Sequence, residues 1–298
     1  MKNILIIGCG LIGSSLLRAI IKKKISQKVF VYEKSKANII KIKKLRLACV
    51  IINDFKSVVP KMDLIIFCTP MSEYEKIILK INRYLSPKTV ITDVGSSKES
   101  TLLLIKKKLK KGISWTSSHP ISGSEVSGPE FGNANLFLNK WCILIKEKNT
   151  NKRDMILLNK FWKIIGSKVA TMSAKQHDST FSMTSHLPHL IAYNLVKTAV
   201  DFEKSKKYDL IKFSAGGLRD FSRIAASNEI MWRDIFFNNQ SNISEAIDLF
   251  IKNLKSFKKD INFKNNKSLI KKLIETKKVR KKIIKLKQDI NKPDFGRN

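Results

Sequence analysis

Residues 3–13 read NILIIGCGLIG, an apolar run of strand length that ends in the spacing G-x-G-x-x-G. A helix-length segment follows directly, so the glycines lie in a turn between a strand and a helix. In such a turn the first glycine permits the tight bend, the second lets the backbone approach a pyrophosphate, and the third lets helix and strand pack closely. The helix N-terminus adds free N–H groups and a positive dipole that favour phosphate. The residues expected to bind a dinucleotide here are Gly8, Gly10, Leu11, Ile12 and Gly13.

An acidic residue after the next predicted strand favours a nucleotide site over a glycine-rich turn that binds nothing. Val29–Tyr32 is typical of a strand, and Glu33 lies twenty residues after Gly13. A carboxylate at this position accepts hydrogen bonds from a ribose 2′-hydroxyl and repels a 2′-phosphate. We therefore predict NAD as the cofactor in preference to NADP, although Lys34 and Lys36 could tolerate a phosphate.

Strand–helix alternation continues through the first half of the chain and predicts a mainly parallel α/β sheet of the Rossmann-like type. The strand candidates are short aliphatic or β-branched runs, namely Asn3–Ile7, Val29–Tyr32, Leu64–Cys68, Val90–Asp93, Trp141–Ile145 and Lys168–Met172. The helix-length segments are Ile12–Lys24, Lys36–Arg46, Ser72–Tyr84, Lys98–Leu109 and Met155–Ile165. Thr69 and Pro70 come directly after the third of these strands, at the sheet edge where ligands collect. We expect these two residues to border the cofactor ribose.

Strand signals stop at about Ser173, where apolar residues change to helical spacing. The helical segments are Lys175–Phe202, Ser227–Asn238 and Ile243–Lys258, followed by a basic terminal helix with a frayed end after about Asp289. We expect a dinucleotide-binding Rossmann-like domain over 1–172 and an all-α domain with a basic tail over 173–298. The active site is then expected between the two domains.

Composition excludes several classes of protein. The chain has 298 residues, 43% of them hydrophobic, which suits one large or two ordinary domains and excludes a largely disordered chain. Its four cysteines are too few and too scattered for a disulfide scaffold or a CxxC metal site. We therefore expect a reducing, cytoplasmic location and no metal. No apolar run reaches the length of about 18–20 residues that crosses a membrane, so no membrane partner is expected.

The charge has two interpretations. There are 58 Lys and Arg against 24 Asp and Glu, a formal net charge of +34, and such a field attracts nucleic acid. However, lysine is spread along the whole chain together with abundant Ile and Asn, as in an A+T-rich genome, and no nucleic-acid-binding motif is present. We interpret the charge as compositional, and we expect nonspecific nucleic-acid binding at most.

His119 is the leading catalytic candidate. It lies in SHPISGSE, residues 118–125, and it is one of only four histidines. The ordinary pKa of histidine suits proton transfer near neutrality. A loop histidine with a structural hydrogen bond is the alternative, but its position downstream of a dinucleotide loop favours catalysis.

Two arginines are candidates for binding an anionic substrate. Arg219 and Arg223 lie four residues apart, so on a helix both can point to one face. The planar guanidinium binds a carboxylate through two N–H groups and stays charged at any working pH. A surface ion pair is the alternative for Arg219.

The other histidines carry weaker signals. His186 and His189 have the spacing of possible metal ligands, but Pro188 lies between them and no third ligand is near. His177 has no motif around it and is treated as a surface or core residue. Two further residues are expected to serve packing or dimer contacts rather than a cofactor, Met231 and Trp232.

Taken in chain order, these motifs resemble the prephenate/arogenate dehydrogenase family of tyrosine biosynthesis over about residues 1–240. They are GCGLIGSS at 8–15, TDVGSSK at 92–98, SHPISGSE at 118–125, SHLPH at 185–189, GGLRDFSRIA at 216–225 and SNEIMWRD at 227–234. The resemblance implies that His119 binds the ring hydroxyl of the substrate and that Ser96, near the nicotinamide, orients both. It also implies a set of substrate-binding residues, to which we add Arg219: Ser124, Glu125, His186 and Arg223.

The activity that the resemblance implies is oxidative decarboxylation of prephenate to 4-hydroxyphenylpyruvate with NAD+, in a homodimer built through the helical domains. His119 would take the hydroxyl proton as hydride leaves, and loss of CO2 would make the ring aromatic without a metal. The alternatives are arogenate as substrate, which gives tyrosine directly, or a 3-hydroxy acid or imine dehydrogenase of the same two-domain class. A basic nucleic-acid-binding protein is the remote alternative.

Overall fold

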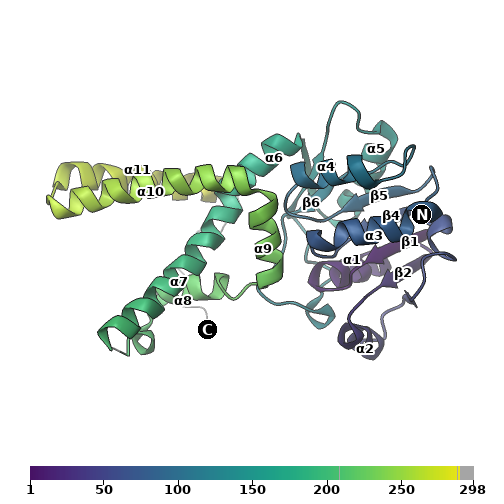
Figure 1. The fold of residues 1–298 in the computed structure, drawn as a ribbon, viewed down its shortest axis with the longest axis horizontal. Coiled ribbons are helices and arrows are strands. Elements are labelled where there is room, and N and C mark those ends of the chain that lie inside the picture. The colour runs from purple at the N-terminus through teal and green to yellow at the C-terminus, as the bar shows by residue number, and fades with distance from the viewer. Residues whose placement is uncertain (208, 287, 289–298) are drawn as a thin grey trace.

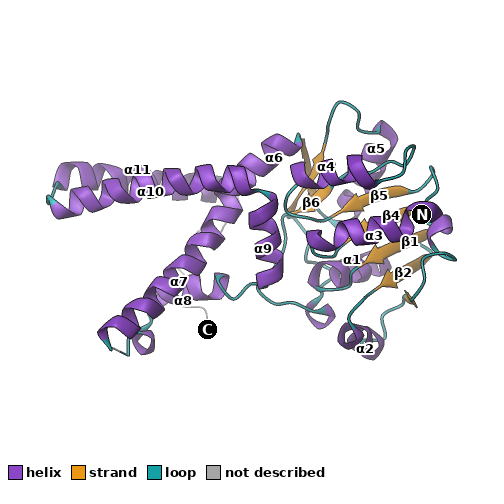
Figure 2. Cartoon of the chain, in the orientation of Figure 1, coloured by secondary structure: helices purple, strands orange, loops and turns teal. Residues whose placement is uncertain are grey.

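The chain folds into an α/β half and a helical half (Figures 1 and 2). The computed structural model describes residues 1–298 with the exception of 208, 287 and 289–298. Within the described residues, every strand lies before Ser173 and only helices and turns follow it. This confirms the predicted fold class. The predicted frayed end after about Asp289 lies outside the described residues.

Five parallel strands form the main sheet, in the order β3-β2-β1-β4-β5. Their bounds are β1 (Asn3–Ile7), β2 (Lys28–Tyr32), β3 (Val50–Ile52), β4 (Leu64–Phe67) and β5 (Val90–Asp93). Because β1 lies in the centre with β2 on one side and β4 on the other, the strand order reverses at the carboxyl end of β1. Ligands bind at such switch points in open α/β sheets. The sequence had indicated all of these strands except β3, which has only three residues.

Alternate residues of β1 pack against opposite faces of the sheet. Ile4 and Ile6 join a core with helices α1 (Leu11–Lys22) and α5 (Lys152–Ile165), whereas Leu5 and Ile7 face α3 (Tyr74–Ile81). All four side chains are fully buried. Because both faces are covered, the central strands read as continuous apolar runs. The other helices of this half are α2 (Lys36–Lys44) and α4 (Glu99–Lys108).

A second, three-stranded sheet adjoins the first. Its strands are β6 (Ser118–Pro120), β7 (Trp141–Ile145) and β8 (Lys168–Met172), with β7 in the centre, antiparallel to β6 and parallel to β8. Ser118 Oγ of β6 donates to Asp93 O of β5 at 2.7 Å, and an isolated bridge pairs Ile91 of β5 with Trp115 just before β6. The sequence predicted β7 and β8 but not β6, because Ser-His-Pro has no strand pattern.

Helices of very different length make up the helical half. They are α6 (Ala174–Phe181), α7 (Leu187–Lys206), α8 (Gly216–Ile224), α9 (Glu229–Asn238), α10 (Gln240–Asn262) and α11 (Asn266–Lys285). A π-helical turn, Ser182–His186, interrupts the single helix expected over 175–202. Pro188 has no N–H to continue the hydrogen-bond ladder, and the wider turn before it absorbs this irregularity.

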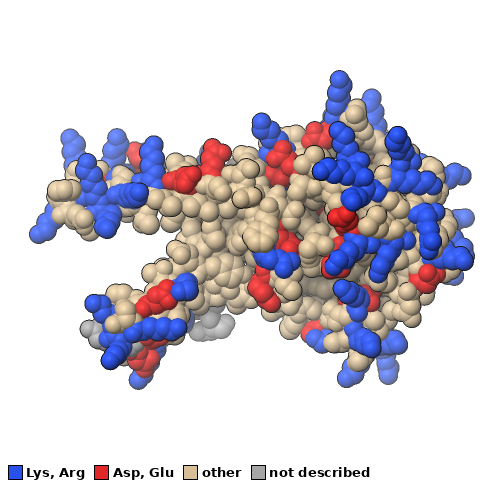
Figure 3. Space-filling model, in the orientation of Figure 1, with Lys and Arg blue, Asp and Glu red and all other residues tan. Residues whose placement is uncertain are grey.

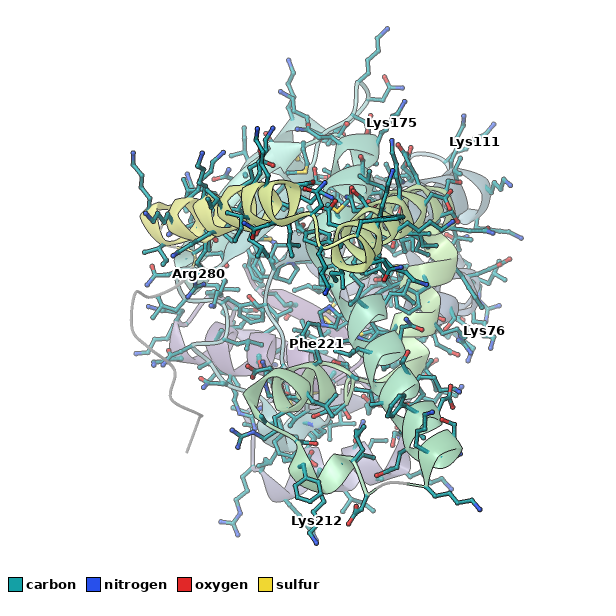
Figure 4. The ribbon with its side chains drawn as sticks, turned by 90° about the vertical axis from the view of Figure 1, so that its left-hand side faces the viewer. Lys76, Lys111, Lys175, Lys212, Phe221 and Arg280 are labelled. Carbon is teal, nitrogen blue, oxygen red and sulfur yellow. The ribbon has the colours of Figure 1, made fainter. Side chains whose placement is uncertain are left out.

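Two arms extend from the α/β half, one formed by α7 and α8 and the other by α10 and α11 (Figure 1). Figure 4 shows Lys212 and Arg280 on separate arms. Neither α8 nor α11 buries a residue in the single chain. The larger apolar side chains exposed on α7, α10 and α11 are Leu195, Phe202, Leu249, Ile251, Leu254, Ile261, Ile270, Leu273, Ile274, Val279 and Ile283. The arms therefore leave much apolar surface uncovered.

Lys and Arg side chains are spread over both halves rather than gathered in one patch in the view of Figure 3. Among the described residues, no helix is both long enough and apolar enough to span a bilayer. Short 3-10 turns complete the structure at Val59–Lys61, Met71–Glu73, Asn82–Tyr84, Pro129–Phe131 and Ile211–Phe213.

Candidate active site

The glycine turn after β1 has the geometry that a dinucleotide requires. Gly8 has φ +91°, which a residue with a side chain rarely adopts, and its N–H donates to Tyr32 O at 2.8 Å. A Cβ on Gly13 would lie 2.0 Å from Gly8 O, so only glycine allows this approach of helix to strand. A Cβ on Gly10 would meet nothing within 4 Å, which leaves the backbone open toward a ligand.

At the start of α1, no side chain among the described residues caps the free N–H groups that a phosphate would bind. Gly10 is the N-cap and offers no side-chain hydrogen bond, and the first turn contains no acidic residue. The first N–H groups of a helix have no partner within the helix, so those of Leu11, Ile12 and Gly13 can face a phosphate. These residues fit the group that the sequence predicts.

Glu33 lies where it was expected, at the carboxyl end of β2. Its Oε2 accepts from Cys9 N at 2.7 Å, and its Oε1 accepts from Ser35 N at 2.9 Å. The carboxylate is therefore fixed against the glycine turn. Lys34 lies 3.7 Å from Glu73 and is largely exposed, so it does not neutralise Glu33 directly.

The turn after β4 packs against the glycine turn. A Cβ on Gly8 would lie 2.7 Å from Thr69 Cγ2 and 2.9 Å from the carbonyl of Cys68. Thr69 Oγ1 is buried and has no hydrogen-bond partner among the described residues, which suits a group that donates to or accepts from a bound ligand. Pro70 follows on the surface, and Ser72 N donates to Asp234 Oδ2 of α9 at 2.9 Å. This turn thus also joins the helical half.

A buried ion pair supports the next part of the site. Lys98 Nζ lies 2.7 Å from Asp93 Oδ2 and donates to Ser118 O, also at 2.7 Å, and both charged side chains are fully buried. This pair ties the end of β5 to β6. Ser96 lies in the loop that the pair closes, half-buried.

His119, in the middle of β6, is nearly buried and bonded to a second histidine. It is 8% exposed, and its Nδ1 lies 2.8 Å from His177 Nε2. Burial, and then the nearby His177, Lys98 and His186, hold the pKa of His119 well below its ordinary value. The imidazole is therefore neutral near pH 7, the form in which it can accept a proton.

His177 is a member of the site that the sequence did not indicate. It is fully buried on α6, and its Nδ1 lies 2.7 Å from Asp178 Oδ1. The sequence indicates a surface or core residue at this position. His177 is a core residue, but its contact with His119 was not foreseen. No local motif could have shown this contact, because 58 residues separate the two histidines.

His186 lies on the π-helical turn, next to the same group. Burial, the largest cause, lowers its pKa to about 4, while the charge of Asp178 and, to a smaller extent, the Ser96 backbone act in the opposite direction. Its Nδ1 lies 3.0 Å from Asn239 Nδ2, and its Nε2 is buried without a hydrogen-bond partner among the described residues. The structure thus brings together Ser96, His119 and His186, as expected.

Arg223 reaches the loop that follows His119. Its Nη1 lies 3.6 Å from Glu125 Oε2, and Ser124 Oγ donates to the same oxygen at 3.0 Å. Arg223 Nε is buried with no hydrogen-bond partner in the described part of the chain. The segment 119–125 thus contacts the helical half twice, through His119 at His177 and through Glu125 at Arg223.

Arg219 has a different environment from Arg223. It is exposed on α8, and the described residues provide no partner for its guanidinium. Trp232 is buried and stacks on His189 with ring centroids 3.9 Å apart, whereas Met231 is 39% exposed. Among the described residues, no cluster of His, Cys, Asp and Glu could hold a metal ion.

Comparison with known proteins agrees with this geometry. A family model described as the nucleotide-binding domain of prephenate dehydrogenase matches residues 16–171, and one described as its dimerization domain matches 173–275. The chain belongs to the prephenate dehydrogenase family. This confirms the resemblance, the fold class and the prediction of a dehydrogenase.

Relatives in this family match nearly the full chain. Cyclohexadienyl dehydrogenase of Zymomonas mobilis is 33% identical, with 94% of this chain and 95% of the relative covered. Prephenate dehydrogenase of Bacillus subtilis is 31% identical over 85% of this chain and 69% of its own length. The crystal structure of prephenate dehydrogenase from Aquifex aeolicus with hydroxyphenyl propionate and NAD+ has a TM-score of 0.88 at 33% identity, covering 95% of this chain and 98% of that one.

Proposed function

We propose that this chain catalyses the NAD+-dependent oxidative decarboxylation of prephenate to 4-hydroxyphenylpyruvate. One observation carries the proposal: the segment 119–125, which begins with a buried, neutral His119, contacts the helical half at both ends, His119 at His177 and Glu125 at Arg223. A general base and a guanidinium from opposite sides suit a substrate that has a hydroxyl at one point and carboxylates at others.

NAD is the cofactor of this dehydrogenase, as predicted, and the Aquifex aeolicus relative was crystallised with NAD+. When bound, its nicotinamide accepts the hydride. Glu33 would accept hydrogen bonds from the ribose, and its negative charge would disfavour a 2′-phosphate. The other residues proposed to hold the cofactor are Gly8, Gly10, Leu11, Ile12, Gly13, Thr69 and Pro70.

Roles for the substrate-binding residues are proposed from their places on the segment 119–125 and on the parts of the protein near it. His119 takes the proton of the ring hydroxyl, and Ser96 orients histidine and substrate. Arg223 binds a carboxylate and exchanges part of its contact with Glu125 for the substrate, since its Nε has no partner. Ser124 and His186 line the site, and the exposed Arg219 adds positive charge that attracts a dicarboxylate.

We further propose a homodimer formed through the helical half, with residues 1–172 as the dinucleotide-binding domain and 173–298 as the helical domain. The match of a dimerization domain to 173–275 and the apolar side chains left exposed on the arms support this proposal. The scattered, free cysteines support a reducing, cytoplasmic location.

Arogenate is the second candidate substrate. A relative from Methanocaldococcus jannaschii, 24% identical, is named probable arogenate/prephenate dehydrogenase. The two compounds differ in a keto or an amino group on the side chain, and the contacts described above involve the hydroxyl and carboxylates that they share.

A rate matrix of prephenate and arogenate against NAD+ and NADP+ tests the proposal. The full chain should reduce NAD+ fastest with prephenate and form 4-hydroxyphenylpyruvate. Faster reduction with arogenate, with tyrosine as product, would select the second candidate. Correctly folded protein that reduces neither cofactor with either substrate would contradict both.

A further inference from the structure

A chain of hydrogen bonds runs from His119 away from the glycine turn and into the protein. His119 Nδ1 lies 2.8 Å from His177 Nε2, and His177 Nδ1 lies 2.7 Å from Asp178 Oδ1. The same carboxylate accepts from Lys98 N at 2.8 Å and from Glu99 N at 2.9 Å, at the start of α4. His177 and Asp178 are at most 1% exposed, so this chain is sealed from water.

The direction of each hydrogen bond in this series follows from its last member, the Asp178 carboxylate. All the neighbours of the Asp178 carboxylate are N–H donors, so it acts only as an acceptor. His177 must then donate from Nδ1. Burial lowers the pKa of His177, so it is neutral near pH 7 and its Nε2 carries no proton. His119 must therefore donate from Nδ1 to His177, and its own Nε2 keeps a free lone pair.

The main-chain carbonyl of Asp178 also takes part in setting the tautomer of the second buried histidine, His186. Asn239 Nδ2 donates to Asp178 O at 2.8 Å and lies 3.0 Å from His186 Nδ1. Asn239 Oδ1 accepts from Asn242 Nδ2 at 2.8 Å, which fixes the orientation of the amide. His186 Nδ1 is therefore an acceptor, and the single proton of this neutral ring lies on Nε2.

We propose that Asp178, through His177 on one side and Asn239 on the other, holds His119 and His186 in opposite tautomers. His119 presents a bare Nε2 and His186 presents an Nε2–H, so the site offers one acceptor and one donor to the same substrate. This inference rests on the proposed function. Asp178, His177 and Asn239 are positioning residues, since none of them is proposed to touch the substrate.

The opposite tautomers match the groups of a hydroxy dicarboxylate. The bare Nε2 of His119 accepts the hydroxyl proton: the O–H bond breaks, an N–H bond forms, and the electron pair left on oxygen makes the carbonyl as hydride departs. The imidazolium that forms on His119 is bonded through His177 to the negative charge of Asp178, which stabilises it. The Nε2–H of His186, unpartnered among the described residues, can donate to an oxygen of the substrate.

Nuclear magnetic resonance of the full chain labelled with 15N-histidine tests the tautomers directly, because there are only four histidines. His189 Nδ1 lies 2.9 Å from the carbonyl of Ser185, so it too must carry its proton on Nδ1. We expect three rings with Nδ1–H, those of His119, His177 and His189, and one, His186, with Nε2–H. A spectrum in which His119 carries its proton on Nε2 would overturn the proposal.

Kinetics of two kinds of variant separate positioning from packing. Asp178→Asn can donate to His177 and so invert the tautomers of His177 and His119, while the main-chain carbonyl that faces Asn239 is unchanged. The kcat should fall roughly 10²–10⁴-fold with unchanged NAD+ affinity; replacing the tautomer-setting aspartate of a serine protease costs about 10⁴. His177→Gln still offers an acceptor to His119 Nδ1 and should retain most of kcat, whereas His177→Leu offers none and should lose at least about 100-fold. Equal kcat for the Gln and Leu variants would overturn the proposal.

Asp154→Asn is the matched control, since Asp154 is a buried aspartate in the first turn of α5, outside this chain of hydrogen bonds. Its kcat and histidine spectrum should equal those of the wild type. Asp178→Asn with wild-type kcat and an unchanged spectrum would overturn the proposal. If the wild type fails to oxidise prephenate, the proposed function fails, while the spectrum still decides the tautomers.

Discussion

The two halves of the molecule reach stability in different ways. The α/β half covers both faces of its main sheet, buries every residue of β1 after Asn3, and even seals a Lys–Asp ion pair. The helical half extends two arms with many apolar side chains on the surface, and one of its ion pairs, between Lys197 and Asp201, is exposed. The first half thus buries its apolar side chains within the single chain, whereas the arms of the second leave many of theirs exposed. Catalytic candidates come from the side of each half that faces the other.

The largest expected effect comes from breaking the buried ion pair. Lys98→Met leaves Asp93 charged and unpaired in a fully buried place, which should lower the free energy of unfolding by about 3–5 kcal/mol. Lys197→Met removes an exposed i,i+4 pair in the helical half and should cost less than about 1 kcal/mol. Denaturant unfolding measures both variants. Equal losses of unfolding free energy in the two variants would show that the buried ion pair contributes no more to stability than the exposed one.

A pH series tests the buried histidines where the halves meet. Burial lowers the pKa of His186 from 6.5 to about 4, and it also lowers those of His119 and His177. As pH falls below about 6.5, these histidines become protonated in the unfolded chain but stay neutral in the folded one, so the free energy of unfolding falls. For His186 alone the loss approaches about 3 kcal/mol at pH 4.

Thermal unfolding between pH 7 and pH 4.5 measures this dependence. The wild-type Tm should fall steadily below pH 6.5, and His186→Gln should give a shallower slope because one of the titrating rings is absent. An identical slope in the two proteins would show that His186 is charged alike in the folded and unfolded states.

Changes to the exposed apolar side chains of the arms are expected to alter the oligomeric state rather than the stability of the single chain. The variant Leu195→Gln/Leu254→Gln/Leu273→Gln should shift the protein toward monomer, since each leucine covered by a partner contributes about 1.5–3 kcal/mol. The control Leu79→Gln/Leu103→Gln/Ile156→Gln changes residues of the α/β half that are at least as exposed and should leave the mass unchanged. Light scattering measures both. A dimer that survives the first set as well as the second would contradict the proposed interface.

The sequence predicted those features that local patterns encode. The glycine turn and the acidic residue after β2 carry their function in spacing, and the structure places Glu33 against the turn as expected. Aliphatic or β-branched runs gave six of the strands, and the central strands β1 and β4 have the continuous apolar signature that burial on both faces leaves.

Features that depend on distant contacts were not visible in the sequence. His177 and Asp178 have no motif, and their place beside His119 arises only when α6 packs against the start of α4 and the second sheet. The strand β6 is short and polar, so it was expected as a loop although it holds His119 in place. Arg219 and Arg223 were expected on one face of a helix, with a surface ion pair as the alternative for Arg219; of the two, Arg223 contacts the opposite half.

The central claim is that one substrate touches both halves in the same turnover, His119 at its hydroxyl and Arg223 at a carboxylate. Steady-state kinetics with prephenate at saturating NAD+ test it on the wild type, His119→Asn and Arg223→Ala. We predict that His119→Asn lowers kcat about 10²–10⁴-fold, that Arg223→Ala raises KM at least about tenfold, and that NAD+ affinity is the same in all three proteins. A wild-type kcat in His119→Asn, or a wild-type KM in Arg223→Ala, would contradict the account.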